Sequence, residues 1–175
     1  MKQTALRYAI YSVLLMLALS MVHFFIVLKN VGYNTLEASG YLTMLLSMIF
    51  VFFGIRHYRN EKNNGVLSFG QGLKLGLLII LIPSVFFGLF DVFYAKVINP
   101  NWVEDCYDSM RRSMTPAEFE VKRKEFESQL ELYSNPFFQF LIMFGTVFII
   151  GFIVTIISAL SLQRKRPVSN KVMST

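Results

Sequence analysis

Two ionisable side chains, His23 and Asp91, lie within long apolar stretches of this 175-residue sequence. An ionisable group inside a bilayer costs roughly 2.5–3.5 kcal/mol, so each is a candidate functional residue. If both stretches are membrane helices that run in the same direction, both side chains lie roughly 7 Å beyond the bilayer centre on the same side. The sequence therefore predicts an intramembrane polar pair, His23 and Asp91. The alternative is that each side chain reaches the headgroups or hydrogen-bonds a neighbouring helix.

A glycine-rich stretch at residues 63–79, NNGVLSFGQGLKLGLLI, has some of the spacing of a nucleotide-binding turn. Such a turn needs a strand before it and a helix after it, whereas here a polar loop precedes and an apolar run follows. Small residues at four-residue spacing instead favour close packing of two membrane helices, although glycines are also simply common in such helices. The predicted helix-packing face comprises Gly72, Gly76, Ser84 and Gly88. The identity of the partner helix stays open.

Few residues are suited to catalysis or metal binding. The chain has one cysteine, Cys106, and two histidines, which provide neither an intrachain disulfide nor a Cys/His metal cluster. It contains no Gly-x-Ser-x-Gly elbow and no His-Glu-x-x-His pair. Glu104, Asp105 and Asp108 have the spacing of an ordinary solvated helix face. We therefore expect a protein that is not an enzyme and that has no cofactor and no metal site.

The elements that must hold these residues are membrane helices. The chain is 54% hydrophobic, more than the ~45–50% usual for soluble domains. Its apolar residues form blocks at 8–28, 38–55, 75–90 (resuming after Asp91) and 137–162. A helix of roughly 17–25 residues crosses the hydrocarbon, and backbone groups in lipid must bond within the segment, so four spans are predicted. The first block is too long for a signal-peptide core, which favours a retained span.

Charge distribution predicts the orientation. With four spans, one side carries both termini, the 56–74 loop and almost only basic charge, whereas the other carries most of the acidic residues. Flanks rich in Lys and Arg stay in the cytoplasm, so both termini are predicted to be cytoplasmic and residues 98–135 outside. The net charge of +6 then reflects topology and anionic lipid rather than nucleic acid. The predicted lipid-headgroup anchors are Arg56, Tyr58, Arg59, Lys74, Arg164, Lys165 and Arg166.

The segment 98–135 is the largest part outside the predicted spans. Apolar residues recur at helical spacing from Trp102, and Thr115-Pro116-Ala117-Glu118 is typical of a capped helix start. Two amphipathic helices are therefore predicted, which fold onto each other or rest on the headgroups. The overall fold is all-α: a four-helix transmembrane domain, residues 1–163, with a helical hairpin between spans three and four. Residues 164–175 are predicted to be a basic, disordered tail.

The stretch FFGIRHYRNEKNNGVLSFGQGLKLGLLI, residues 52–79, resembles the hallmark of a bacterial family of small four-span membrane proteins, the domain of unknown function four-one-nine-nine. LYSNPFFQFLIMF at 132–144 and IISALSLQRK at 156–165 resemble the entry and exit of that family's last span. The chain has FIIGFIV where relatives often carry a proline-containing patch. The resemblance implies the four-span fold and a bacterial inner-membrane location, but no activity.

These observations favour a non-enzymatic scaffold or accessory subunit. Its partner, another membrane or periplasmic protein or a second copy of the chain, would bind to the outer helices or to the glycine face of span three. The alternative is a small transporter or channel that uses the His23 and Asp91 region. Lipid is the expected environment in both cases, and no nucleic acid is expected.

Overall fold

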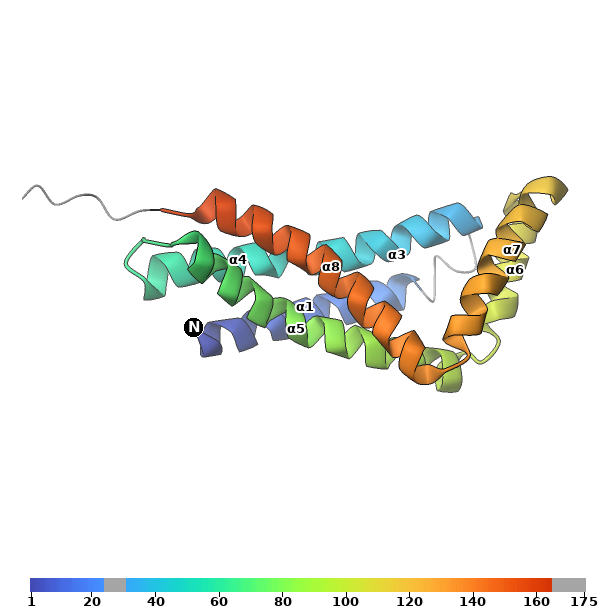
Figure 1. Ribbon diagram of the computed structural model, residues 1–175, viewed down its shortest axis with the longest axis horizontal. Helices are drawn as coiled ribbons and strands as arrows, with labels where there is room; N and C mark the ends of the chain where they lie inside the picture. The colour runs from blue at the N-terminus through green and yellow to red at the C-terminus, as the bar shows by residue number, and fades with distance from the viewer. Residues whose placement is uncertain (24–30, 165–175) are drawn as a thin grey trace, which may run out of the picture.

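The structure, a computed structural model, describes residues 1–23 and 31–164 and is helical throughout most of that part (Figure 1). Four helical segments are long and apolar enough to cross a membrane, which confirms the predicted four-span, all-α fold. The first span is α1 (Lys2–Val22), and the fourth is α8 (Pro136–Leu162). The second span consists of α3 (Tyr33–Ser47), α4 (Ile49–His57) and the π-helical turn η2 (Tyr58–Lys62). The third consists of α5 (Phe69–Phe93) and the π-helical turn η3 (Tyr94–Ile98). The last residues predicted for span one, 24–28, lie outside the described residues.

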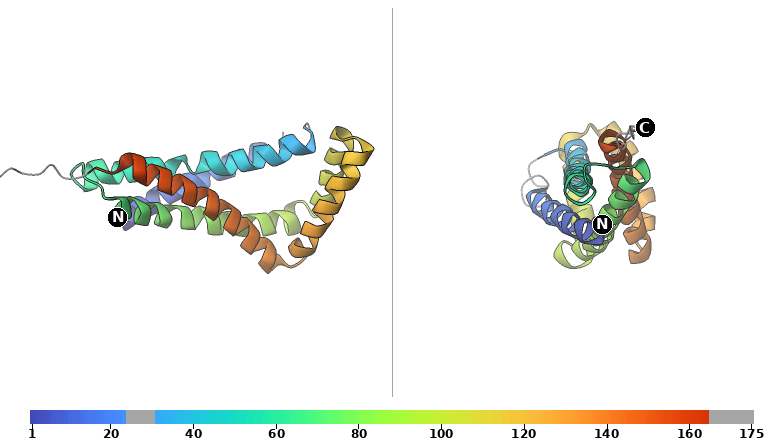
Figure 2. Two further views of the ribbon diagram at one scale, coloured as in Figure 1. Left: turned by 45° about the horizontal axis from the view of Figure 1, so that its top comes forward. Right: turned by 90° about the vertical axis from the view of Figure 1, so that its left-hand side faces the viewer.

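The two termini of the described chain lie at one end of the bundle, and a helical hairpin stands across the other end (Figures 1 and 2). The hairpin consists of α6 (Trp102–Ser113) and α7 (Pro116–Tyr133). It confirms the two helices predicted between spans three and four. We refer to the two ends of the molecule as the termini end and the hairpin end.

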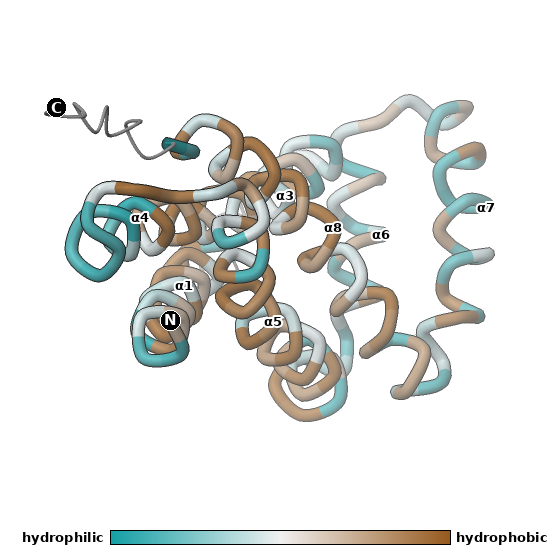
Figure 3. The backbone as a smooth tube through the Cα atoms, turned by 60° about the vertical axis from the view of Figure 1, so that its left-hand side comes forward, coloured by the Kyte–Doolittle hydropathy of each residue, from teal (hydrophilic) through white to brown (hydrophobic). Residues whose placement is uncertain are grey.

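The most extensive helix contact is between α5 and α8, and α1 and α4 complete the bundle (Figure 2). The interior of the bundle is filled largely with apolar side chains. Its fully buried members include Met48, Ile79, Ile80 and Val147, each 0% exposed. Hydrophobic residues predominate along these helices (Figure 3), and many of them are exposed, including Leu14, Leu89 and Ile149. Exposed apolar side chains are expected on helices that face lipid.

Local sequence signals explain where three helices begin. Ser68 and Gln71 form a reciprocal capping box at the start of α5, and Thr115 and Glu118 form another at the start of α7. The Asn135 side chain accepts a hydrogen bond from the Phe137 amide at the start of α8, where Pro136 occupies the first turn. These caps satisfy amides that have no partner within their helices.

The second span is interrupted at Met48, between α3 and α4, which the hydropathy pattern did not predict. The Ser47 hydroxyl donates to the Thr43 carbonyl one turn earlier, at 2.6 Å, a contact that tends to bend helices. The span also starts earlier than the charge-free block predicted, because α3 extends outward past Glu37 to Tyr33. This extension brings α3 to the hairpin.

The hairpin packs onto α3 through a small core of its own. Tyr33, Met110 and Phe126 are buried there, and Trp102 and Phe119 are among the side chains that pack around them. Of the two arrangements predicted for these helices, the structure has the one in which they pack together. Two serines of α6 add hydrogen bonds. The Ser113 hydroxyl accepts one from the Tyr33 amide at 3.2 Å, and the Ser109 hydroxyl donates one to the Val31 carbonyl at 3.1 Å.

Candidate functional site

A cavity of about 560 Å³ lies between the hairpin and the bundle. It is bordered by the end of α1 and by α3, α5, η3, α6, α7 and α8, so residues distant in the sequence meet there. Both members of the predicted polar pair, His23 and Asp91, line it. The cavity is therefore the place where the candidate functional side chains gather.

The Asp91 carboxylate is held by a glutamine of the neighbouring helix. Gln139 Nε2 of α8 donates to Asp91 Oδ2 at 2.8 Å, and the Gln139 side chain is 2% exposed. The other carboxylate oxygen, Oδ1, accepts no hydrogen bond from the described residues. The hydrogen bond to one oxygen therefore orients the carboxylate, while the other oxygen keeps its capacity to accept hydrogen bonds.

His23 is positioned by α3. Its Nδ1 lies 3.0 Å from the Ser39 hydroxyl, which itself donates to the Leu36 carbonyl at 2.8 Å. Because the single hydroxyl proton of Ser39 goes to Leu36, we assign the proton of this contact to His23 Nδ1. His23 and Asp91 thus line one cavity with hydrogen bonds to different residues, and a direct contact between them stays a prediction.

The rest of the cavity wall is rich in aromatic rings, with apolar side chains between them. Six aromatic residues contribute: Tyr33, Tyr41, Tyr94, Trp102, Phe126 and Tyr133. Burial, with a smaller effect of the Asp91 charge, raises the pKa of Tyr133 to about 12, so its hydroxyl stays neutral. Tyr41 and Leu132 are 52% and 53% exposed, which places the mouth of the cavity between α3 and α7.

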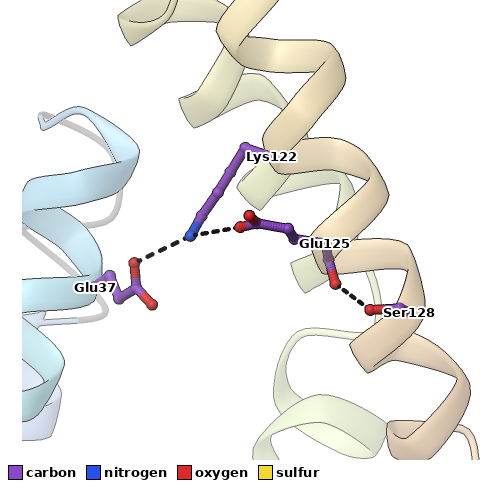
Figure 4. Close-up of polar contacts among 4 residues, drawn as sticks. All are labelled: Glu37, Lys122, Glu125 and Ser128. Atoms are coloured by element: carbon purple, nitrogen blue, oxygen red, sulfur yellow. Dashed lines mark hydrogen bonds and ion pairs between the residues drawn. The ribbon is translucent and has the colours of Figure 1, made fainter.

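A lysine of the hairpin contacts Glu37, one of the residues that line the cavity (Figure 4). Lys122 Nζ of α7 lies 3.8 Å from Glu37 Oε2 of α3 and 3.4 Å from Glu125 Oε2 of its own helix. The same ammonium lies 5.7 Å from the centroid of the Tyr33 ring. The hairpin is therefore joined to α3 by an ion pair and a cation–π contact, both of which involve residues that line the cavity, Glu37 and Tyr33.

Replacing Lys122 with alanine is expected to loosen the hairpin by about 0.5–1 kcal/mol, because both contacts are partly exposed. Hydrogen exchange of the α6 and α7 amides should become faster, and the difference from wild type should shrink at high salt. Lys124→Ala is the matched control, since Lys124 is exposed and forms no ion pair with the described residues. Equal exchange in both variants would argue against the Lys122 contact.

The single cysteine, Cys106, also lines the cavity. Burial, assisted by the nearby charge of Asp105, raises the pKa of its thiol to about 12. Asp105 is hydrogen-bonded to Asn99 at 2.7 Å and Asp108 to Arg111 at 3.1 Å. Among the described residues, no three His, Cys, Asp or Glu side chains come together as a metal site.

The raised pKa predicts slow alkylation of Cys106. Because only the thiolate reacts, the rate should rise about tenfold per pH unit from pH 8 to pH 10, whereas an ordinary exposed thiol levels off near pH 9. The rate of iodoacetamide incorporation measured by mass spectrometry across this range checks the prediction. A plateau below pH 10 would show that the thiol is not buried.

The predicted packing face of span three lies against α8 of the same chain. A Cβ atom built on Gly72 would lie 3.0 Å from Ala159 Cβ, and one on Gly88 would lie 2.8 Å from Phe140 Cδ2. Gly76 approaches Thr155 more closely still. Ser84, in the same helix, is fully buried and donates to the Ile80 carbonyl. The glycines of this face are therefore covered within the chain.

Five of the predicted lipid anchors are described, and they lie in or next to α4, η2, α5 and α8: Arg56, Tyr58, Arg59, Lys74 and Arg164. Arg59 has an additional role, because its Nη1 donates to the Leu162 carbonyl at the end of α8, at 3.3 Å. The backbones of Leu67 and Arg164 also exchange two hydrogen bonds, which tie the end of α8 to the loop before α5. The other two predicted anchors, Lys165 and Arg166, lie outside the described residues.

Sequence reasoning missed the residues that hold the polar pair. Gln139 is an uncharged polar residue one turn inside α8, and Ser39 lies one turn beyond Leu36 in α3. The signal for Gln139 was present, because a glutamine within an apolar span needs a hydrogen-bonding partner. The partner itself is visible only in the folded bundle.

A four-span helical bundle with a hairpin over one end defines a multi-pass membrane protein. Residues 7–164 match the model of the family described as "Protein of unknown function (DUF4199)", and the chain belongs to this family. This match confirms the resemblance found in the sequence. No curated protein and no solved structure matches the chain.

Proposed function

We propose that this protein is a non-enzymatic protein of the bacterial inner membrane that binds a small amphipathic molecule in the cavity beneath its hairpin. Both termini are cytoplasmic in this proposal, and the hairpin is outside. The observation that carries it is the cavity of about 560 Å³, whose largely apolar and aromatic wall includes the polar side chains of Asp91, His23 and Glu37. Ligand sites in proteins typically have a volume of about 300–1,000 Å³ and combine apolar walls with a few polar groups.

The cavity supports binding rather than conduction. Toward the termini end, the bundle is filled by Met48, Ile79, Ile80 and Val147, each 0% exposed. A transporter or channel that uses the His23 and Asp91 region would have to open this packed layer. The transporter hypothesis therefore requires a second conformation, whereas binding requires only the present one.

Filling the cavity tests the proposal. Gly40 lines it, and a Cβ atom at this position would lie 3.8 Å from His23 Cε1, so Gly40→Phe introduces its ring without a backbone clash. Gly145→Phe is the matched control, because a Cβ on Gly145 meets no atom within 4 Å. Native mass spectrometry of protein from native membranes should show a bound molecule in wild type and in Gly145→Phe, but not in Gly40→Phe. The same bound species in all three would contradict the proposal.

The orientation rests on charge. The termini end of the described chain carries Lys2, Arg7, Arg56 and Arg59, and the hairpin carries acidic residues in excess of basic ones. A cysteine at the exposed Ser128 of α7, in a Cys106→Ser background, should react with a membrane-impermeant maleimide added to intact cells. Reaction only after the membrane is opened would reverse the orientation.

The second candidate function is an accessory subunit whose partner binds the hairpin. It is supported by Val121 of α7, which is 63% exposed on a helix outside the spans. With the glycine face covered by α8, the hairpin is the surface that this hypothesis uses. A photo-crosslinking residue at position 121 should then capture one defined membrane protein, whereas the same residue at the exposed Glu120 should not. Equal capture at both positions would count against a specific partner.

A further inference from the structure

We propose that the molecule bound in this cavity presents an organic ammonium group, with Asp91 as its counter-ion. This inference rests on the proposed function and specifies its ligand. The ammonium belongs either to a free amine or to a lipid headgroup, since both carry the same cationic chemistry. The charge of the cavity wall, its aromatic rings and the position of Lys122 support the assignment.

The charge of the cavity wall favours a cationic ligand. The described residues that line the cavity include two carboxylates, Asp91 and Glu37, but no lysine or arginine. Asp91 has no ion-pair partner within 4.0 Å among the described residues, and its Oδ1 accepts no hydrogen bond from them. A cation in the cavity would supply the missing partner at the one carboxylate oxygen that Gln139 leaves open.

The aromatic rings of the cavity wall also favour a cationic ligand. Aromatic rings attract cations through the negative faces of their π systems, and aromatic residues around a carboxylate are a recurrent way to bind ammonium ligands. Trp102 and Tyr133 are close together here, with ring centroids 6.2 Å apart, and Tyr41 and Tyr94 contribute from α3 and η3. A quaternary or primary ammonium can therefore contact rings on several sides.

The ammonium group of Lys122 shows the same chemistry at two residues of the cavity lining. It lies 3.8 Å from a Glu37 oxygen (Figure 4), and 5.7 Å from the centroid of the Tyr33 ring. Glu37 and Tyr33, which both line the cavity, thus hold one ammonium between a carboxylate and an aromatic ring. Deeper in the cavity, Asp91 offers a second carboxylate without a lysine.

The apolar part of the wall accounts for the rest of the ligand. Leu36, Met44, Ile142 and Met143 line the same space, and the mouth lies between Tyr41 and Leu132, which are both about half exposed. A ligand with a short hydrocarbon portion therefore places its ammonium at Asp91 and its apolar part against these side chains.

Trp102 allows a direct test, because it is the chain's single tryptophan and lines the cavity. Its fluorescence in the detergent-purified full chain is titrated with choline and with neohexanol, the uncharged isostere of choline, at constant ionic strength. Parallel samples receive micelles that contain phosphatidylcholine or phosphatidylglycerol. Choline should change the Trp102 fluorescence saturably, and its half-saturating concentration should be at least tenfold below that of neohexanol. Phosphatidylcholine acting at lower concentration than choline would identify a headgroup as the source, and the reverse order a free amine.

Variants complete the test. Asp91→Asn keeps a hydrogen-bonding group for Gln139 but removes the charge, and it should weaken choline binding at least tenfold. Glu37→Gln should weaken it about threefold, and Asp108→Asn, a carboxylate-to-amide change outside the cavity wall, should leave it unchanged. The ammonium assignment would be overturned by any of three results: equal responses to choline and neohexanol, equal responses to the two lipids, or equal choline binding in Asp91→Asn and wild type. Each of these results would still leave a ligand cavity. No response to any probe would overturn the ammonium assignment, whereas the proposed function is overturned only if native mass spectrometry shows the same bound species in wild type and Gly40→Phe.

Discussion

Replacing Gly76 with alanine is expected to lower the free energy of unfolding by about 2 kcal/mol, within the ~1–3 kcal/mol that overpacking costs. The added Cβ would overlap Thr155 Cγ2 and lie 2.8 Å from Thr155 Oγ1. Threonine is branched at Cβ and fully buried here, so it cannot rotate away without strain. The α5–α8 contact, the most extensive in the bundle, would have to separate.

Gly70→Ala is the matched control in the same helix. A Cβ on Gly70 meets no atom within 4 Å, so the substitution should be neutral or stabilising by about 0.5 kcal/mol through helix propensity alone. Both values are measurable by reversible unfolding in mixed micelles. Equal stability of Gly76→Ala and Gly70→Ala would mean that α5 and α8 do not approach closely at this point.

Gln139→Leu is expected to lower the free energy of unfolding by about 2–3 kcal/mol, because it leaves a carboxyl group without its hydrogen-bonding partner. Gln139 Nε2 donates to Asp91 Oδ2 at 2.8 Å, and both side chains lie between α5 and α8. The loss should appear as a lower unfolding midpoint in the same assay.

The double variant Asp91→Leu/Gln139→Leu is the control for this contact. Replacing both polar partners with apolar groups removes the unsatisfied carboxyl, so the double variant should be more stable than Gln139→Leu alone. Asp91→Leu alone completes the comparison. If the stability lost in the double variant equalled the sum of the losses in Asp91→Leu and Gln139→Leu, the two side chains would not interact.

Hydropathy and capping signals in the sequence were sufficient for the spans and the hairpin. The apolar blocks predicted four helices because lipid requires backbone groups to bond within each segment. Thr115 is predicted as a helix start because a hydroxyl followed by Glu three residues later satisfies free amides locally. These signals depend on residues close in sequence, which is why they could be recognised without the fold.

The cavity could not be predicted in this way. It depends on Tyr33, Cys106 and Gln139, which belong to three different helices and are brought together only by packing. Asp91 was singled out by its charge, but Gln139 was not, because only the α5–α8 contact makes it the partner. Arg59 was assigned to the lipid headgroups, and its bond to the Leu162 carbonyl likewise required the position of α8.

The central claim is that the hairpin closes over the cavity by docking on α3. A disulfide between Gly32→Cys and Ser113→Cys, in a Cys106→Ser background, tests it most directly, because a Cβ on Gly32 would lie 2.6 Å from Ser113 Cβ. A displacement of about 1 Å then reaches the ~3.8 Å that a disulfide requires. We predict rapid oxidation to an intrachain crosslink in native membranes, and none for Gly32→Cys paired with a cysteine at Ser128. If both cysteines at 32 and 113 stayed reduced and reactive, the hairpin would not be docked on α3, and the cavity would not exist as described.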